Sequence, residues 1–268
     1  MLIAVTRPVS PTLAQCELTH LAREPIDIAR ATAQHAAYEQ RLGELGAGIV
    51  RAPAAPDLPD AVFVEDTALV LAEVAVITRP GSPRRRLETA AVATLLSAYR
   101  PLSCLTHPAT LDGGDVLHIE HTLFVGRSSR TNEEGIEQLR SLLAPFDYRV
   151  IPVEFTGCLH LKSAVTRIAD ELLLANPDWV SSSPFRPLEA IPVDAREPYG
   201  ANALRIAGTV VYPAQFPRTR DRMVERGLGV VSLDCSELAK AEGAVTCCSL
   251  VFQDGKSAVR HAGVDPHR

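Results

Sequence analysis

The sequence predicts an α/β protein in which five similar units, each a strand, a strand, a helix and a strand, form a ring. The first observation behind this prediction is an internal repeat. Each unit opens with a polar or reactive cluster, continues with two apolar strands joined by a short turn, and then reaches a basic or proline-containing loop. Four units read "FVEDTALVLAEVAVITRPGSPRRR", "LDGGDVLHIEHTLFVGRSSRTN", "CLHLKSAVTRIADELLLANPDW" and "YGANALRIAGTVVYPAQFPRTR", and a fifth opens at "VTCCSLVF".

The second observation is the spacing of the repeat. Five positions taken as equivalent lie 49, 48, 39 and 46 residues apart, which is the spacing of a supersecondary unit. These positions are Asp66, Asp115, Ser163, Asn202 and Cys248. The unusual polar residues all fall at unit openings, and a ring would bring these openings together at one centre. An ordinary α/β sandwich with similar strands is the alternative to the ring.

The third observation is that helical patterns follow several of the strand pairs. Apolar residues recur at helical spacing in segments 27–46, 86–99, 132–146 and 218–227. The first helix is predicted to begin at Asp27 and end at Gly46, and the last to stop at Gly227. Asn132 or Thr131 is the predicted cap of the third helix.

Composition limits the partners and the location of the protein. The chain has 268 residues, 46% of them hydrophobic, which allows a substantial core and favours one domain. A net charge of −5 predicts no basic surface for nucleic acid. No apolar run approaches the about 18 residues of a membrane span, and the start "MLIAVTRPVSP" lacks a secretion signal. Six cysteines without framework spacing favour free thiols in the cytoplasm.

The neighbouring cysteines in "GAVTCCSL" offer a nucleophile, because a thiolate attacks electrophilic carbon readily. If this segment is a strand, successive side chains face opposite sides. Cys248 would then share a mostly apolar face with Thr246, Leu250 and Phe252, which predicts a packing role. Cys247 would face the site. The alternative is that both cysteines are small buried side chains.

His160 in "GCLHLKS" alternates with two leucines, which predicts that its ring lies on the face opposite to theirs. A lone histidine of this kind is typical of a core. A histidine at one unit opening and a cysteine at another, however, suit a nucleophile and its acid/base. Zinc is the competing interpretation, because Cys158, His160 and the neighbouring cysteines are soft ligands. The usual ligand spacing is absent.

Five carboxylates interrupt the apolar runs "PDAVFVED" and "LDGGDVL", where burial is costly unless a cation meets them. They are Asp60, Glu65, Asp66, Asp112 and Asp115. Protein Arg or Lys side chains are one candidate partner and a bound cation is another. A guanidinium matches carboxylates through paired N–H donors, so these acids beside a thiolate indicate attack on a guanidinium carbon. The paired glycines of "LDGGDVL" leave room for close backbone approach, although such pairs are also common in turns.

Six segments, in this order, resemble the dimethylarginine dimethylaminohydrolase family of the guanidine-modifying superfamily. They are "LPDAVFVEDTALV", "ITRPGSPRRR", "LDGGDVL", "FVGRSSRTNEEG", "LHLKS" and "TCCSL". The resemblance implies a pentein-like fold, a pseudo-symmetric propeller of five ββαβ units, with one catalytic domain over residues 1–253. The remaining residues, 254–268, form a tail without a counterpart. The segment "TRPVSPTLAQCEL" matches the family's lid loosely, which could change the guanidine that fits.

The resemblance also implies a catalytic set. Cys247 matches the nucleophile, His160 the general acid/base and Asp112 the acidic partner that completes the triad. The Cys247 thiolate would attack the guanidinium carbon of an Nω-methylated arginine, and His160 would protonate the departing methylamine or dimethylamine. Water would then hydrolyse the S-alkylthiouronium on Cys247 to citrulline. No metal and no organic cofactor are required.

Seven further residues match positions that contact substrate in the family. Glu65 and Asp66 match residues around the guanidinium and its support. Leu18 matches a contact from the lid, and Ala241 matches a position that binds through its backbone. The groups that hold the amino-acid end match Asp60, Arg85 and Arg130.

Two alternatives to a methylarginine hydrolase remain. A sister amidine hydrolase acting on arginine or Nω-hydroxyarginine would use the same catalytic pair. A non-catalytic arginine-binding or zinc-binding propeller is the alternative from another class, and the intact counterparts of nucleophile, base and acid argue against it. The expected partner is a small cationic amino acid, without nucleic acid or membrane, and a homodimer is left open.

Overall fold

The structure, a computed structural model, describes residues 1–255, so the predicted tail 254–268 lies almost wholly outside the described residues. Within the described part, fifteen strands form five three-stranded sheets. These are β15–β1–β2 (Leu250–Gln253, Leu2–Thr6, Ala47–Arg51), β3–β4–β5 (Ala68–Val70, Ala75–Ile77, Leu102–Cys104), β6–β7–β8 (Val116–Ile119, Thr122–Gly126, Arg149–Val153), β9–β10–β11 (Val165–Ala169, Leu172–Ala175, Glu189–Pro192) and β12–β13–β14 (Leu204–Ile206, Thr209–Pro213, Gly229–Leu233).

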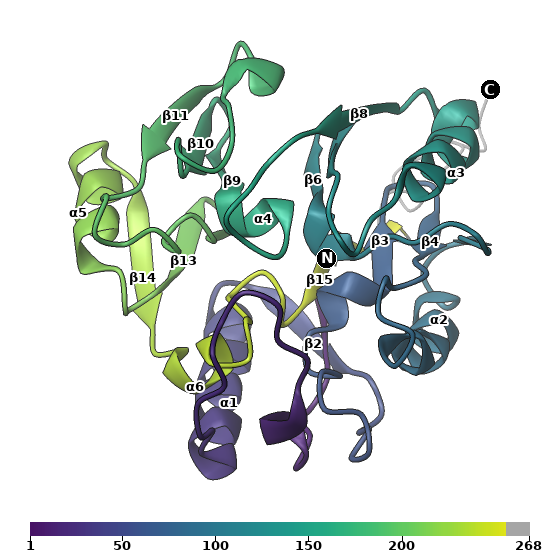
Figure 1. Cartoon of the computed structure of the whole chain (residues 1–268), viewed down its shortest axis with the longest axis horizontal. Coiled ribbons are helices and arrows are strands. Elements are labelled where there is room, and N and C mark those ends of the chain that lie inside the picture. Colours follow the sequence, from purple (N-terminus) through teal and green to yellow (C-terminus); the bar gives the residue numbers. More distant parts are fainter. Residues whose placement is uncertain (256–268) are drawn as a thin grey trace, which may run out of the picture.

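All five sheets have the same topology. The first strand pairs antiparallel with the central strand, and the central strand pairs parallel with the third. A parallel pair needs a crossover connection, which explains why a longer segment follows each central strand. Figure 1 shows the sheets following one another around the middle of the molecule in chain order. The prediction of an α/β chain with repeated strand pairs is confirmed.

Helices occupy four of the crossovers in the described residues. They are α1 (Ile28–Glu44), α2 (Thr89–Leu96), α3 (Glu133–Leu143) and α5 (Pro217–Glu225). The crossover between β10 and β11 contains only the 3-10 turn Ser183–Phe185. Two short helices, α4 (Leu161–Ala164) and α6 (Ser236–Ala239), lie outside the crossovers. The four predicted helices are therefore confirmed.

Local sequence explains where the helices begin and end. The Asp27 side chain accepts a hydrogen bond from a backbone N–H in the first turn of α1, and Asn132 does the same for α3, so Asn132 is the cap. Gly46 and Gly227 follow α1 and α5 with φ of +93° and +81°, a conformation that glycine adopts without strain. α2 is shorter than predicted, because Arg85–Glu88 forms a separate 3-10 turn.

The core is divided among the sheets. α3, for example, buries Ile136, Leu139 and Leu143 completely, and these pack in one cluster with Leu123 and Val125 of β7. Their spacing of three and four residues places them on one helical face. None of the helices in residues 1–255 combines the length and apolar composition that a membrane span requires.

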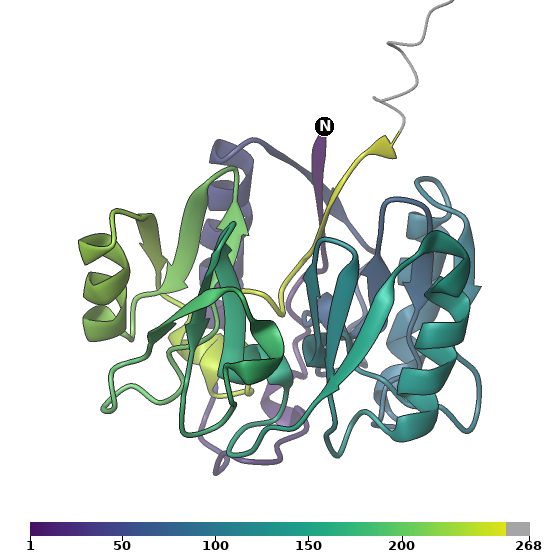
Figure 2. The ribbon, with the colours of Figure 1, turned by 90° about the horizontal axis from the view of Figure 1, so that it is seen from above.

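The first and last strands join the two ends of the described chain. β15 pairs antiparallel with β1, from Leu2 opposite Gln253 to Val5 opposite Leu250. Figure 2 shows these two strands side by side in the middle of the molecule. The sheet that contains β1 is therefore complete only when the C-terminal strand is in place.

Candidate active site

The five positions predicted to be equivalent all lie just before the first strand of a sheet. Asp66, Asp115, Ser163, Asn202 and Cys248 precede β3, β6, β9, β12 and β15, respectively, by one or two residues. Side chains at or beside these openings form hydrogen bonds with one another across the middle of the molecule.

His160 lies within a buried group of carboxylates. Its Nε2 is 3.1 Å from Asp112 Oδ2, and its Nδ1 is 3.9 Å from Asp66 Oδ1. The backbone at Gly114 lies against the His160 ring. Only glycine fits there, because a Cβ at that position would lie 2.5 Å from His160 Nδ1. Burial alone would lower the pKa of His160, but the charges of Asp66 and Asp115 and the hydrogen bond and charge of Asp112 raise it to about 9. His160 is therefore an imidazolium at neutral pH, with two N–H donors.

Asp66 is held ionised by the cations and donors around it. It accepts hydrogen bonds from Arg85 Nη1 at 2.5 Å and from the Gly114 N–H at 2.8 Å. Burial would raise the pKa of Asp66, but the charges of His160 and Arg85 hold it well below its usual range.

Asp112 and Asp115 are completely buried. Asp112 accepts the Gly81 N–H at 2.8 Å, so its position behind His160 is fixed by backbone as well as by the ring. Burial raises the pKa of Asp115 to about 6. Asp115 accepts hydrogen bonds from Ser128 Oγ, Thr131 Oγ1 and the Leu161 N–H. It therefore ties the loop before α3 to the start of α4.

Cys247 and Cys248 lie in a turn, so the predicted strand at these positions is wrong. β15 begins only at Leu250, and the Cys247 N–H donates to the Ala244 carbonyl at 3.2 Å. A turn also separates the directions of neighbouring side chains. Cys247 lines a cavity together with His160, whereas Cys248 is 1% exposed and packs in the core.

The turn that carries Cys247 is clamped by two other units. Thr246 Oγ1 donates to Glu65 at 2.8 Å, and Asn202 exchanges hydrogen bonds with Thr246 at 2.9 and 3.1 Å. The Glu65 N–H also donates to the Cys247 carbonyl at 3.1 Å. Glu65 is buried, which raises its pKa, and pairs with Lys162 Nζ at 2.5 Å. Glu65 thus supports the turn from behind.

The thiol of Cys247 is a poor nucleophile in the free protein. Burial raises its pKa to about 12, with the negative charges of Glu65 and Asp66 acting in the same direction. A half-buried cysteine with this pKa is protonated at neutral pH, and the thiolate is the reactive form. A positive charge brought beside this sulfur would lower the thiol pKa and favour the thiolate.

One cavity brings most of the predicted site residues together. Seven of them line it: Asp60, Asp66, Arg85, Arg130, His160, Ala241 and Cys247. Asp112 is bonded to His160, which lines the cavity. In the described part of the chain, the lining includes neither Glu65 nor Leu18, and Leu18 instead packs against an apolar cluster.

Five lining residues were not predicted from the sequence. They are Glu17, Phe63, Leu159, Glu242 and Gly243. Each adjoins a predicted residue or lies within three positions of one, so neighbourhood in sequence is the signal that could have found them. Their side-chain directions depend on loop conformation, which has no periodic pattern to read.

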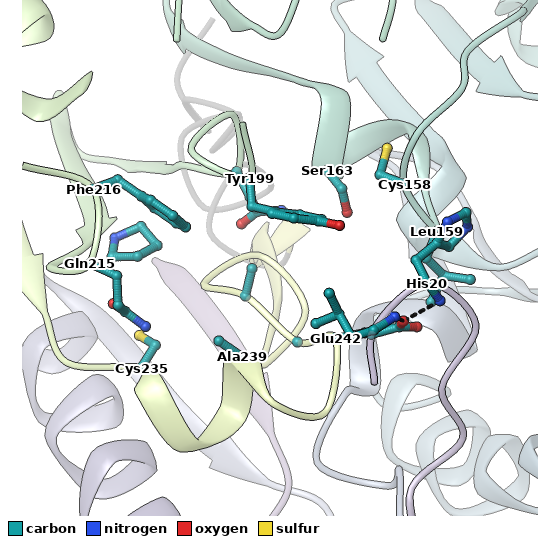
Figure 3. A pocket seen from close by; sticks show the side chains of 15 residues that line it. His20, Cys158, Leu159, Ser163, Tyr199, Gln215, Phe216, Cys235, Ala239 and Glu242 are labelled. Atoms are coloured by element: carbon teal, nitrogen blue, oxygen red, sulfur yellow. Dashed lines mark hydrogen bonds between the residues drawn. The ribbon is translucent and has the colours of Figure 1, made fainter. Parts of the chain in front are cut away.

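The N-terminal loop is fastened over the cavity at two points. The Glu242 carboxylate accepts the N–H groups of Thr19, His20 and Leu21 at 3.0, 2.5 and 2.7 Å. At the other point, the Glu17 N–H donates to Asp60 at 3.2 Å. Figure 3 shows Glu242 bonded to His20 beside a second, mainly apolar pocket that contains Tyr199 and Phe216. Glu242 lines both pockets.

The site also has a group that could hold a metal ion. Ligand atoms of Asp66, Asp112 and His160 lie within 4.8 Å of one another. Among the described residues, no cysteine joins this group, so the zinc set considered from the sequence is not assembled. Arg85 bonded to Asp66 supplies positive charge to the same cluster.

Comparisons with known proteins place this site in a family. The family model described as N,N dimethylarginine dimethylhydrolase, eukaryotic, matches residues 18–187. A Streptomyces coelicolor protein named N(G),N(G)-dimethylarginine dimethylaminohydrolase is 39% identical over 256 residues, covering 94% of this chain and 97% of the relative. A Pseudomonas aeruginosa protein of the same name is 34% identical over 228 residues, covering 84% and 90%.

Solved structures of known proteins resemble this chain in fold. A cysteine-to-serine mutant of the Pseudomonas aeruginosa enzyme, in complex with citrulline, superposes with a TM-score of 0.89 at 32% identity, covering 93% of this chain and 98% of that chain. The N-terminal domain of the cyanobacterial arginine dihydrolase ArgZ has a TM-score of 0.84 at 19% identity, covering 94% and 98%, which is a likeness of fold. This chain, in which Cys247 and the buried cluster of His160 and carboxylates line one cavity, belongs to the dimethylarginine dimethylaminohydrolase family.

Proposed function

We propose that this protein hydrolyses Nω-methylated arginines to citrulline and dimethylamine or methylamine. The observation that carries the proposal is one cavity that holds a cysteine thiol, a buried imidazolium and an ionised carboxylate: Cys247, His160 and Asp66. Two relatives that cover most of the chain are named for this activity, and a solved relative was crystallised with citrulline, the product that the proposal requires.

Asp66 is the carboxylate that we assign to the substrate guanidinium. It lines the cavity, and its low pKa keeps it charged at neutral pH. A guanidinium dimethylated on one terminal nitrogen keeps three N–H donors, so acids on its unmethylated side hold it without leaving a buried carboxylate unpaired. The methylated side would face the apolar part of the cavity lining. Phe63 and Leu159 supply that apolar surface.

The substrate itself would activate the nucleophile. Because the Cys247 thiol is protonated in the free protein, the first step is loss of its proton to water. A guanidinium bound against Asp66 would bring positive charge beside the sulfur and lower the thiol pKa. The thiolate then forms a bond to the guanidinium carbon.

His160 is the group that we assign to proton transfer. Its imidazolium donates a proton to the departing amine nitrogen as the C–N bond breaks, which leaves an S-alkylthiouronium on Cys247. The neutral ring then takes a proton from a water molecule whose oxygen adds to the same carbon. The added hydroxyl loses its proton to water as the C–S bond breaks, which releases citrulline and the thiolate. Asp112, 3.1 Å from Nε2, keeps the ring oriented through both steps.

We further infer that the five sheets form a pseudo-symmetric ββαβ propeller, with one catalytic domain over residues 1–253. The common topology of the sheets and their circular order in Figure 1 support this inference. A cytoplasmic location is part of the proposal, because all six cysteines are free thiols, as a reducing compartment would keep them.

A substrate panel tests the proposed function. Citrulline and amine release would be measured for asymmetric dimethylarginine, monomethylarginine, arginine and Nω-hydroxyarginine, with Cys247→Ser as the inactive control. We expect kcat/KM for both methylated substrates to be at least about tenfold above that for arginine, since an arginine pocket would leave polar groups unpaired. Release of ammonia from arginine, or of hydroxylamine from Nω-hydroxyarginine, at equal or higher efficiency would favour the sister hydrolases instead.

A further inference from the structure

The two arginines of the cavity have different partners. Arg85 is enclosed, since its guanidinium donates to Asp66 at 2.5 Å, to Glu88 at 2.9 Å and to two backbone carbonyls. Arg130 instead pairs with Glu17, whose Oε2 lies 3.2 Å from Arg130 Nη1. Arg130 is therefore the guanidinium that an incoming carboxylate would meet, and Glu17 already lies against it.

Glu17 is fixed in this position by two further contacts. Ser82 Oγ donates to Glu17 Oε1 at 2.7 Å, and the Glu17 N–H donates to Asp60 at 3.2 Å. The side chains of Glu17 and Arg130 are only 25% and 10% exposed, so water screens their attraction weakly. One carboxylate oxygen thus faces Ser82 and the other faces Arg130.

We propose that Glu17 fills, from within the protein, the subsite for a substrate's α-carboxylate, so that the cavity also accepts methylated guanidines without this group. The inference rests on the proposed function and extends its substrate class. The added class is decarboxylated methylarginines, which carry an ammonium at one end and a methylated guanidinium at the other.

The two kinds of substrate make different demands on the ion pair. An α-carboxylate must displace Glu17 from Arg130, which leaves the charge of a largely buried Glu17 without its partner. A decarboxylated substrate leaves the pair intact. Its ammonium would face the carboxylates of Asp60 and Glu17, which line the cavity beside Arg130.

The test compares the affinities of the two ligands without turnover. Calorimetric titration of Cys247→Ser protein would use asymmetric dimethylarginine and its decarboxylated analogue, with and without Glu17→Gln. We expect Glu17→Gln to strengthen binding of the amino acid, because its carboxylate loses a competitor, and to weaken binding of the analogue. The affinity ratio should move at least about tenfold toward the amino acid.

Glu24→Gln is the matched control, because Glu24 is an exposed acid of the same N-terminal loop, and its change should leave the ratio as it is. An unchanged ratio in Glu17→Gln, an equal weakening of both ligands, or no binding of the analogue before Glu17 is changed would overturn the inference. Dimethylamine release by the protein with Cys247 intact tests the proposed function separately, so a shifted ratio without any amine release would refute that function alone.

Discussion

His160 and Cys247 line the same cavity but have opposite electrostatic surroundings. The aspartates around His160 keep its ring protonated, with a pKa raised to about 9. Burial and the charges of Glu65 and Asp66 keep the thiol protonated as well, with a pKa raised to about 12. The pair is therefore ready to donate a proton to a leaving group, but it lacks a thiolate until a cation enters.

This arrangement predicts how Cys247 responds to alkylating reagents. At pH 7.5 an amidinium-bearing reagent should modify Cys247 at least about tenfold faster than neutral iodoacetamide, because the reagent brings the missing positive charge. The iodoacetamide rate should rise with pH, since a raised pKa means that thiolate forms only as pH approaches about 12. Peptide mass spectrometry measures both rates, with exposed Cys104 as the reference in the same chain.

Rapid modification of Cys247 by iodoacetamide at neutral pH, without preference for the cationic reagent, would mean that the free protein already holds a thiolate. The role given to the substrate guanidinium would then be wrong, although the nucleophile would be unchanged.

At the scale of elements, the turns before the first strands determine the site. The 3-10 turn Gly113–Asp115 brings backbone against His160 and Asp66, which only a glycine at position 114 allows. The sequence "LDGGDVL" indicated a close approach of backbone. It did not identify the approaching group, because that group comes from another unit.

Gly114→Ala should therefore impair catalysis more than folding. Its Cβ would lie 2.5 Å from His160 Nδ1 and 2.8 Å from Asp66 Oδ1, so the ring must move. We expect kcat to fall by roughly 100-fold, the usual cost of a displaced catalytic group. Steady-state kinetics and thermal melting measure the two effects. Gly43→Ala is the control, since its Cβ would meet nothing within 4 Å; equal kcat values for the two variants would contradict this geometry.

Helices were easier to predict than loops. Asp27 marked one helix start correctly and Asn132 was one of the two caps predicted for another, because a cap depends on bonds within a few residues. The turn at Cys247 was predicted as a strand because its clamp comes from Glu65 and Asn202, which are remote in sequence. The inward direction of Glu17 was missed for the same reason.

At the scale of the whole molecule, the repeat was readable because each unit has the same pattern of strands. The spacing of 39 to 49 residues predicted five openings, and the structure has five sheets of one topology. Closure of the N-terminal loop was not readable. It depends on Glu242, whose carboxylate collects three N–H groups from residues 19–21 at the opposite end of the chain.

The pairing of β15 with β1 predicts the effect of truncation. A chain that ends at Ser249 loses Leu250 and Phe252, both 6% exposed, and leaves one edge of β1 unpaired. Each side chain contributes about 1.5–3 kcal/mol, a large part of a typical stability of about 5–15 kcal/mol. We expect this chain to be unfolded by circular dichroism, whereas a chain that ends at Gly255 should melt and turn over like the full protein. Cooperative melting of the shorter chain would show that β15 is dispensable.

The central claim is that Cys247 attacks the guanidinium carbon and carries the covalent intermediate. Acid-quenched mass spectrometry during turnover of asymmetric dimethylarginine tests it most directly, in the unaltered protein, in Cys247→Ser and in Cys248→Ser. We predict a mass increase equal to substrate minus dimethylamine, located on Cys247, in the unaltered protein and in Cys248→Ser, which should keep most of its activity. Cys247→Ser should show neither adduct nor turnover. An adduct on Cys248, or turnover by Cys247→Ser, would contradict the account.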